Sequence, residues 1–142
     1  MTKIEWSNKT WNPWIGCRKI APECDHCYAA TFASHGLHTA HSGAGEHGDR
    51  TGAIIRNSPN VWTEPFKWRA GWRVFTCSMS DFWHESVPLP MLDEALAVID
   101  ETPRLTYQIL TKRPGNVGRK LDDCRRMSGS ERRSRIQTVC RC

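Results

Sequence analysis

The feature that most constrains the fold of this chain is a strand–helix–strand pattern between residues 74 and 110. Residues 74–78 form a short β-rich run, and residues 105–110 form a second one. Between them, residues 90–102 begin and end next to prolines and carry apolar side chains at helical spacing. Such a βαβ unit almost always makes a right-handed crossover between parallel strands. The pattern therefore predicts an α/β fold with a parallel sheet.

The chain has 142 residues, which suits one domain of roughly 100–200 residues. A complete (β/α)₈ barrel needs about 250 residues, so a barrel of this length would be partial. Residues 1–124 hold 14 basic and 14 acidic side chains, whereas residues 125–142 hold six Arg against one Glu and supply the whole net charge of +5. The Arg-rich segment shows no helical or strand period, which is typical of disorder. We therefore expect a βα domain over residues 1–123 and a disordered or out-of-frame tail over residues 124–142.

Membrane-spanning and secretory signals in the sequence indicate the compartment of the protein, and the compartment in turn limits how its cysteines are used. No apolar run approaches the roughly 20 residues that span a bilayer, so no membrane association is expected. The N-terminus lacks the apolar core of a signal peptide, so the cytoplasm is the expected location. Seven cysteines, an odd number, in a reducing compartment are unsuited to a disulfide framework. Metal binding or catalysis is therefore the leading use of the thiols.

Three of the cysteines form a compact C-x6-C-x2-C group consisting of Cys17, Cys24 and Cys27. Cys17 and Cys24 lie before a helix that the sequence predicts over residues 25–34, and Cys27 lies in the first turn of that helix. A structural zinc site normally has four protein ligands. A [4Fe–4S] cluster with three cysteine ligands leaves one iron open to a substrate or cofactor, although four ligands are usual. Spacing alone leaves zinc and iron–sulfur as alternatives.

Polar side chains follow both predicted strands. In parallel strands joined by a crossover these segments share one edge of the sheet, and α/β folds place their chemistry there. The candidates after the first strand are Ser78, Ser80, Asp81, His84 and Glu85, and those after the second are Lys112 and Arg113. The sequence thus predicts a functional site at this edge.

Several distinctive strings occur in collinear order between Ile4 and about Val117. They are Ile-Glu-Trp at 4–6, Thr-Trp-Asn-Pro at 10–13, Gly-Cys at 16–17, Cys-Asp-His-Cys-Tyr-Ala at 24–29, Ser-Met-Ser-Asp at 78–81 with His-Glu at 84–85, and Gln-Ile-Leu-Thr-Lys-Arg-Pro at 108–114. Together they resemble the phage gene product thirty-seven/sixty-eight family, which has no known function. That family in turn resembles radical S-adenosylmethionine enzymes with a widened first cysteine interval, such as spore photoproduct lyase. The usual first interval is three residues, whereas this chain has six.

The resemblance implies the N-terminal part of a partial (βα) barrel of radical S-adenosylmethionine type. Cys17, Cys24 and Cys27 would hold a [4Fe–4S] cluster whose fourth iron binds S-adenosylmethionine, and an electron from the cluster would cleave this cofactor to methionine and a 5′-deoxyadenosyl radical. Tyr28 would belong to the shell around the cluster.

The same resemblance suggests roles for the polar residues at the sheet edge. Ser78, Ser80 and Asp81 would contact the amino group of the cofactor. His84 and Glu85 would reach the substrate or a proton, giving Asp81, His84 and Glu85 as the candidate catalytic residues. Lys112 and Arg113 would bind the cofactor carboxylate or a phosphate, the arginine by a bidentate contact.

Two functions follow as hypotheses. The first is a phage-type radical S-adenosylmethionine enzyme whose substrate the sequence does not identify, with a nucleic acid or nucleotide as the candidate class. The second is a zinc-stabilised nucleic-acid-binding module that uses the Arg-rich tail for phosphates. The resemblance fades near residues 121–126, so we expect a truncated and inactive chain whose open sheet edge needs a cover such as a partner protein.

Overall fold

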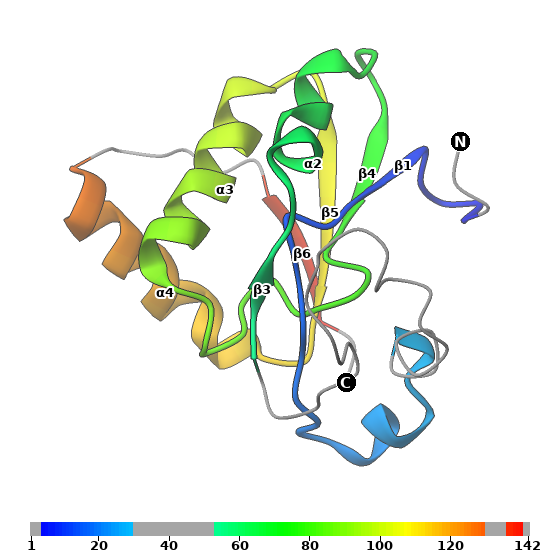
Figure 1. Ribbon diagram of the computed structural model, residues 1–142, viewed down its shortest axis with the longest axis vertical. Coiled ribbons are helices and arrows are strands. Elements are labelled where there is room, and N and C mark those ends of the chain that lie inside the picture. The colour runs from blue at the N-terminus through cyan, green and yellow to red at the C-terminus, as the bar shows by residue number, and fades with distance from the viewer. Residues whose placement is uncertain (1–3, 30–52, 130–135, 141–142) are drawn as a thin grey trace.

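The computed structural model describes residues 4–29, 53–129 and 136–140 of the chain (Figure 1). Its centre is a sheet of four parallel strands in the order β1-β4-β5-β6, which is also their order along the chain. The strands are β1 (Lys9–Trp11), β4 (Arg73–Thr76), β5 (Thr106–Thr111) and β6 (Ile136–Cys140). Two further short strands, β2 (Trp14–Ile15) and β3 (Ile55–Arg56), pair antiparallel.

The three α-helices pack against one another beside this sheet. The α-helices are α2 (Pro59–Thr63), α3 (Leu89–Glu101) and α4 (Pro114–Ser128), and the 3₁₀ helices are η1 (Pro22–His26) and η3 (Glu64–Lys67). Helix α3 contacts both α2 and α4, and Figure 1 shows α3 and α4 side by side along the sheet. The unit β4-α3-β5 joins parallel strands, so the predicted βαβ unit is confirmed.

The core lies between the sheet and these helices. Along β5, Tyr107, Ile109 and Thr111 are buried and alternate with partly exposed residues, as expected for a strand with one face turned to the core. The apolar face of α3 supplies Leu92, Ala95, Leu96, Val98 and Ile99 to the same core. Five aromatic side chains complete it, namely Trp11, Trp14, Trp62, Phe82 and Trp83. The burial of one face of β5 and one face of α3 follows from the apolar periodicity of each element.

The C-terminal part differs from the sequence prediction of irregular structure beyond Asp123. Helix α4 continues to Ser128, and residues 136–140 form β6, which pairs parallel with β5. Arginine is a good helix former, and Arg125 and Arg126 pair with carboxylates one turn earlier. Gly129, with a left-handed φ of 64°, ends the helix. The described residues of this segment are thus helix and strand, which the Arg-rich composition alone does not predict.

The described residues form a mixed α/β fold with a parallel sheet. Their strands do not close into a barrel, and β1 and β6 are the two edges of the sheet. Residues 30–34 of the helix predicted over 25–34 lie outside the described part of the chain. Within the described part, no helix combines the length and apolar character needed to cross a membrane.

Candidate functional site

The loop that carries the three cysteines begins at a glycine whose conformation is essential. Gly16 has a φ of 111°, and a Cβ at this position would lie 1.9 Å from the carbonyl oxygen of Ala53. Only glycine tolerates both features. The Gly16 amide donates to the carbonyl of Met79 (3.4 Å), and Gly16 forms a parallel bridge with Ser80. These contacts bring the next residue, Cys17, to the carboxyl end of β4.

The other end of the cysteine loop is also bonded to the segment that follows β4. The Tyr28 hydroxyl donates to the carbonyl of Ser78 at 2.6 Å. Asn12 holds that segment from the β1 side: its amide contacts the Ser78 hydroxyl (3.0 Å), and its Oδ1 accepts from the Met79 backbone (3.2 Å). The backbone turns sharply at Cys77, which has a left-handed φ of 59°. Hydrogen bonds to Ser78 thus connect the segment after β4 with the cysteine loop through Tyr28 and with the end of β1 through Asn12.

Arg113, directly after β5, lies at the centre of the site and is buried. Its Nε donates to Glu85 Oε2 (2.7 Å), and its Nη1 donates to Asp81 Oδ2 (3.2 Å) and lies 3.8 Å from Cys17 Sγ. Its Nη2 donates to the carbonyl oxygen of Arg18 at 3.0 Å. One guanidinium therefore connects the cysteine loop with the polar segment after β4.

Asp81 is buried and accepts four hydrogen bonds from the protein. Oδ1 accepts from the Trp83 amide (3.0 Å) and the Thr111 hydroxyl (2.8 Å). Oδ2 accepts from the Lys112 amide (3.1 Å) and from Arg113. This carboxylate joins the segments after β4 and β5 and has its lone pairs occupied, which favours a positioning role over the predicted contact with a cofactor ammonium group.

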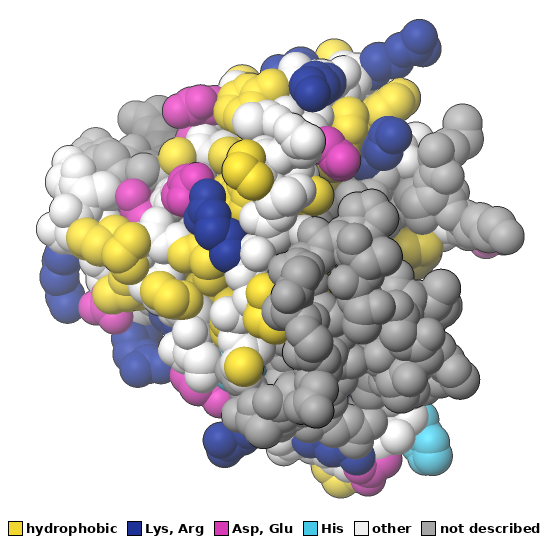
Figure 2. Space-filling model, viewed as in Figure 1, with side chains coloured by type: hydrophobic (Ala, Val, Ile, Leu, Met, Phe, Trp, Pro, Cys, Tyr) yellow, Lys and Arg dark blue, Asp and Glu magenta, His cyan; other side chains and the backbone are white. Residues whose placement is uncertain are grey.

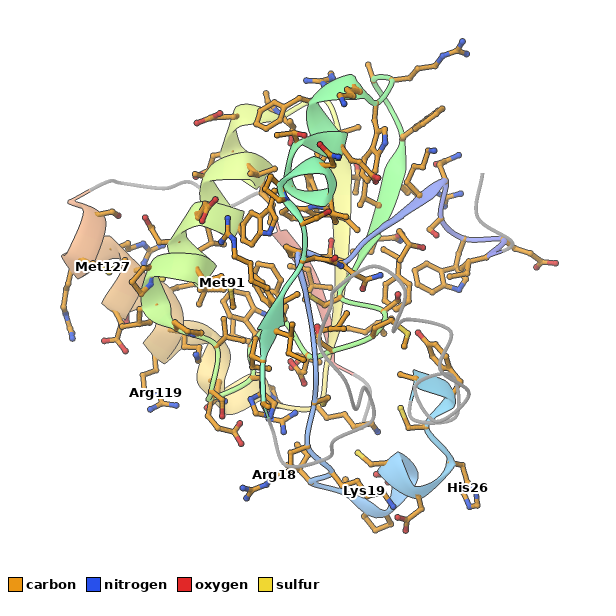
Figure 3. The ribbon with its side chains drawn as sticks, viewed as in Figure 1. Arg18, Lys19, His26, Met91, Arg119 and Met127 are labelled. Carbon is orange, nitrogen blue, oxygen red and sulfur yellow. The ribbon has the colours of Figure 1, made fainter. Side chains whose placement is uncertain are left out.

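Lys112 faces the cysteine loop. Its Nζ lies 3.7 Å from Glu23 Oε2 of η1, and its side chain is partly exposed. Within the loop, Lys19 and Asp25 form a second ion pair. Figure 3 shows Arg18, Lys19 and His26 at the outer end of this loop, with the His26 ring directed away from the sheet. Both basic residues predicted to bind a cofactor, Lys112 and Arg113, thus contact the cysteine loop.

His84 and Glu85 complete the polar segment after β4. His84 is 1% exposed, and its Nδ1 accepts from the Ser86 amide at 3.0 Å. The proton of the neutral ring therefore belongs on Nε2, which has no hydrogen-bond partner among the described residues and lies 3.9 Å from Glu85 Oε1. Burial lowers the pKa of His84, and the nearby Arg113 charge lowers it further. His84 is therefore a neutral, buried ring beside a half-exposed carboxylate.

The three cysteines of the loop are free, partly buried thiols, whereas Cys77 and Cys124 are fully buried. Burial raises the pKa of Cys17, and the guanidinium of Arg113 opposes this rise. The described residues contain no group of three His, Cys, Asp or Glu side chains placed to hold a single ion. Each thiolate of a [4Fe–4S] cluster binds a different iron, so a cluster does not need sulfurs that converge on one point. Three thiols on one loop, the first of them 3.8 Å from the Arg113 guanidinium, are ligands of the kind that such a cluster takes.

Two residues of the site, Asn12 and Thr111, lie in the distinctive strings at 10–13 and 108–114 but are not among the predicted site residues. Asn12 precedes a proline at the end of β1, and Thr111 is the last residue of β5. Both act through contacts with segments far away in sequence, at Ser78 and Asp81 respectively. The alternation along β5 places Thr111 on the core face with Tyr107 and Ile109, and this pattern is a signal in the sequence that identifies it.

Comparisons with known proteins identify the family. A family model described as "Protein of unknown function (DUF5131)" matches residues 1–136. The match includes the cysteine loop, both polar segments at the sheet edge and helix α4. No curated protein matches the chain, and no solved structure does. Because the family match covers far more than half of its length, the chain belongs to the DUF5131 family of proteins of unknown function.

Proposed function

We propose that this protein is an iron–sulfur protein of the radical S-adenosylmethionine type. The observation that carries the proposal is the attachment of the cysteine loop to both polar segments at the carboxyl edge of the sheet, through Gly16 and Met79 and through Arg113 and Cys17. Parallel α/β folds place their active sites at this edge. Cys17, Cys24 and Cys27 would hold a [4Fe–4S] cluster there.

The strand order supports a partial (βα) barrel. The four parallel strands follow one another in chain order, and the two helices that connect neighbouring strands pack against each other. A doubly wound sheet instead reverses its strand order at a switch point. A sheet wound in one direction is the arrangement that a barrel requires, so we propose that this domain is the N-terminal part of one.

S-adenosylmethionine bound at such a cluster would supply one-electron chemistry that side chains do not provide. The chain's own residues would position and neutralise charge at the site. Asp81 is engaged by four protein donors, whereas the Glu85 side chain is 45% exposed and uses one oxygen for Arg113. We therefore assign Glu85, rather than Asp81, as the carboxylate available to an ammonium group. The neutral His84 ring would keep a proton on Nε2 beside it.

A nucleic acid or nucleotide is the substrate class that we propose for this site, on the basis of the family resemblance. The zinc-stabilised nucleic-acid-binding module has less support. Arg125 and Arg126 of the Arg-rich segment already pair with Asp122 and Asp123. On the face shown in Figure 2, the described Lys and Arg side chains are interspersed with Asp and Glu and form no single basic patch.

Anaerobic reconstitution of the full chain with iron and sulfide tests the proposal. We expect iron and acid-labile sulfide in the ratio of a [4Fe–4S] cluster, with broad visible absorption. Separate Cys17→Ala, Cys24→Ala and Cys27→Ala variants should lose the cluster. Cys77→Ala and Cys124→Ala, which remove buried thiols outside the loop, should retain it once circular dichroism has shown that they fold. One zinc ion per chain without sulfide would refute the proposal.

A further inference from the structure

We infer that Arg113 is a positioning residue that binds Cys17 and sets the reduction potential of the cluster. This inference rests on the proposed function, because it concerns the group that Cys17 would hold. It assigns Arg113 a task other than binding the carboxylate or phosphate of a ligand. The contacts of the Arg113 guanidinium and the charges around it support this inference.

The guanidinium is fully engaged inside the protein. Arg113 is 6% exposed, and each of its three nitrogens has a partner: Glu85 for Nε, Asp81 and the Cys17 sulfur for Nη1, and the Arg18 carbonyl for Nη2. A ligand carboxylate would have to displace two buried or half-buried ion pairs to reach it. The planar fork of arginine makes all these contacts at once, which a lysine ammonium group cannot.

These contacts fix the first cysteine of the loop from two sides. Nη1 lies 3.8 Å from Cys17 Sγ, and Nη2 donates to the carbonyl of the next residue, Arg18. Asp81 and Glu85 hold the guanidinium in this orientation. Arg113 therefore links Cys17 and Arg18 to the end of β5.

The same contacts place a positive charge and an N–H donor beside a ligand sulfur. Net charge and hydrogen bonds to the sulfurs are among the factors that set iron–sulfur potentials. A positive charge stabilises the more negative, reduced form of a cluster, so Arg113 should raise the potential. Glu85, which pairs with Arg113 at 2.7 Å, partly offsets that charge and should lower the potential. Removing the two residues should thus have opposite effects.

A redox titration of the reconstituted full chain, followed by electron paramagnetic resonance, tests the inference. For Arg113→Gln we expect a more negative potential, equivalent to at least a tenfold loss of the reduced form, or about 59 mV for one electron. Arg113→Lys, which keeps the charge but not the fork, should shift it less. Glu85→Gln should shift it in the positive direction, by a smaller amount because Glu85 is half-exposed and its charge is screened.

The opposite directions of the two expected potential shifts distinguish an effect of Arg113 on the cluster potential from a purely structural role of this residue. If Arg113→Gln does not fold, the Glu85→Gln variant decides, because its side chain is half-exposed and its loss leaves Arg113 paired with Asp81. An unmoved potential, or shifts of the same sign in Arg113→Gln and Glu85→Gln, would overturn the inference and leave the proposed function intact. A wild-type chain that binds no cluster would refute the proposed function, and this inference with it.

Discussion

Replacement of Asp81 with alanine tests whether this carboxylate holds the site together. The substitution removes the acceptor of four hydrogen bonds, donated by two backbone amides, the Thr111 hydroxyl and Arg113. It also removes one partner of a buried ion pair, because the Asp81 and Arg113 side chains are 7% and 5% exposed. The donors would remain in the protein interior without their acceptor.

The size of the effect follows from these contacts. A buried donor left without a partner costs about 1–3 kcal/mol, and removal of one member of a buried ion pair costs about 3–5 kcal/mol. These costs overlap, since Arg113 keeps Glu85 as a partner and water can reach part of the new space. We therefore expect Asp81→Ala to lower the free energy of unfolding by about 3–5 kcal/mol, a large part of the roughly 5–15 kcal/mol of a typical domain.

Urea unfolding of the metal-free, reduced chain measures this loss, with tryptophan fluorescence and far-ultraviolet circular dichroism as probes. Asp81→Asn, which keeps one acceptor oxygen, should cost less than Asp81→Ala. Asp122→Ala is a matched surface control, because its ion pair with Arg125 is exposed, and it should cost less than about 1 kcal/mol. A loss below about 1 kcal/mol for Asp81→Ala would refute the assignment of Asp81 as the residue that anchors Arg113.

Two further predictions concern the cysteine loop and the buried histidine. Gly16→Ala should destabilise the chain by about 2 kcal/mol or more in urea unfolding and reduce iron retention, because its Cβ would overlap the Ala53 carbonyl. Gly118→Ala, in open space on α4, is the control and should instead stabilise the chain by about 0.5–1 kcal/mol. Equal effects of the two substitutions on stability would contradict the proposed requirement for glycine at position 16. Because burial lowers the pKa of His84 in the folded state, the unfolded state binds more protons below pH 6.5, so the melting temperature should fall as the pH decreases from that value. His84→Asn, which keeps an acceptor for the Ser86 amide, should weaken this dependence, and an unchanged slope would show that other groups cause it.

The sequence predicted those parts of the fold that depend on local patterns. The β4-α3-β5 unit follows from apolar runs and helical periodicity, and the shared edge follows because the two strands are parallel. The shared edge of the sheet brings Asp81 and Arg113 together as expected. The sequence did not reveal that the two side chains bind each other, because the choice of hydrogen-bond partner depends on tertiary contacts.

The C-terminal helix shows where composition misleads. Arg125 and Arg126 belong to an Arg-rich segment, yet each has an aspartate three residues earlier on α4. Charge pairs at this spacing support a helix, and a count of charges over the segment does not detect them. The required conformation of Gly16 is likewise set by Ala53, a residue distant in sequence, so no local pattern identifies it.

The most direct test of the account is the electron paramagnetic resonance spectrum of the reconstituted, reduced protein before and after addition of S-adenosylmethionine. Three cysteine ligands leave one iron of a [4Fe–4S] cluster open to a small molecule. We expect a cluster signal that changes when S-adenosylmethionine is added, in wild type and in the Cys124→Ala control alike. A cluster signal that the cofactor leaves unchanged, or a protein that gives no cluster signal, would contradict it.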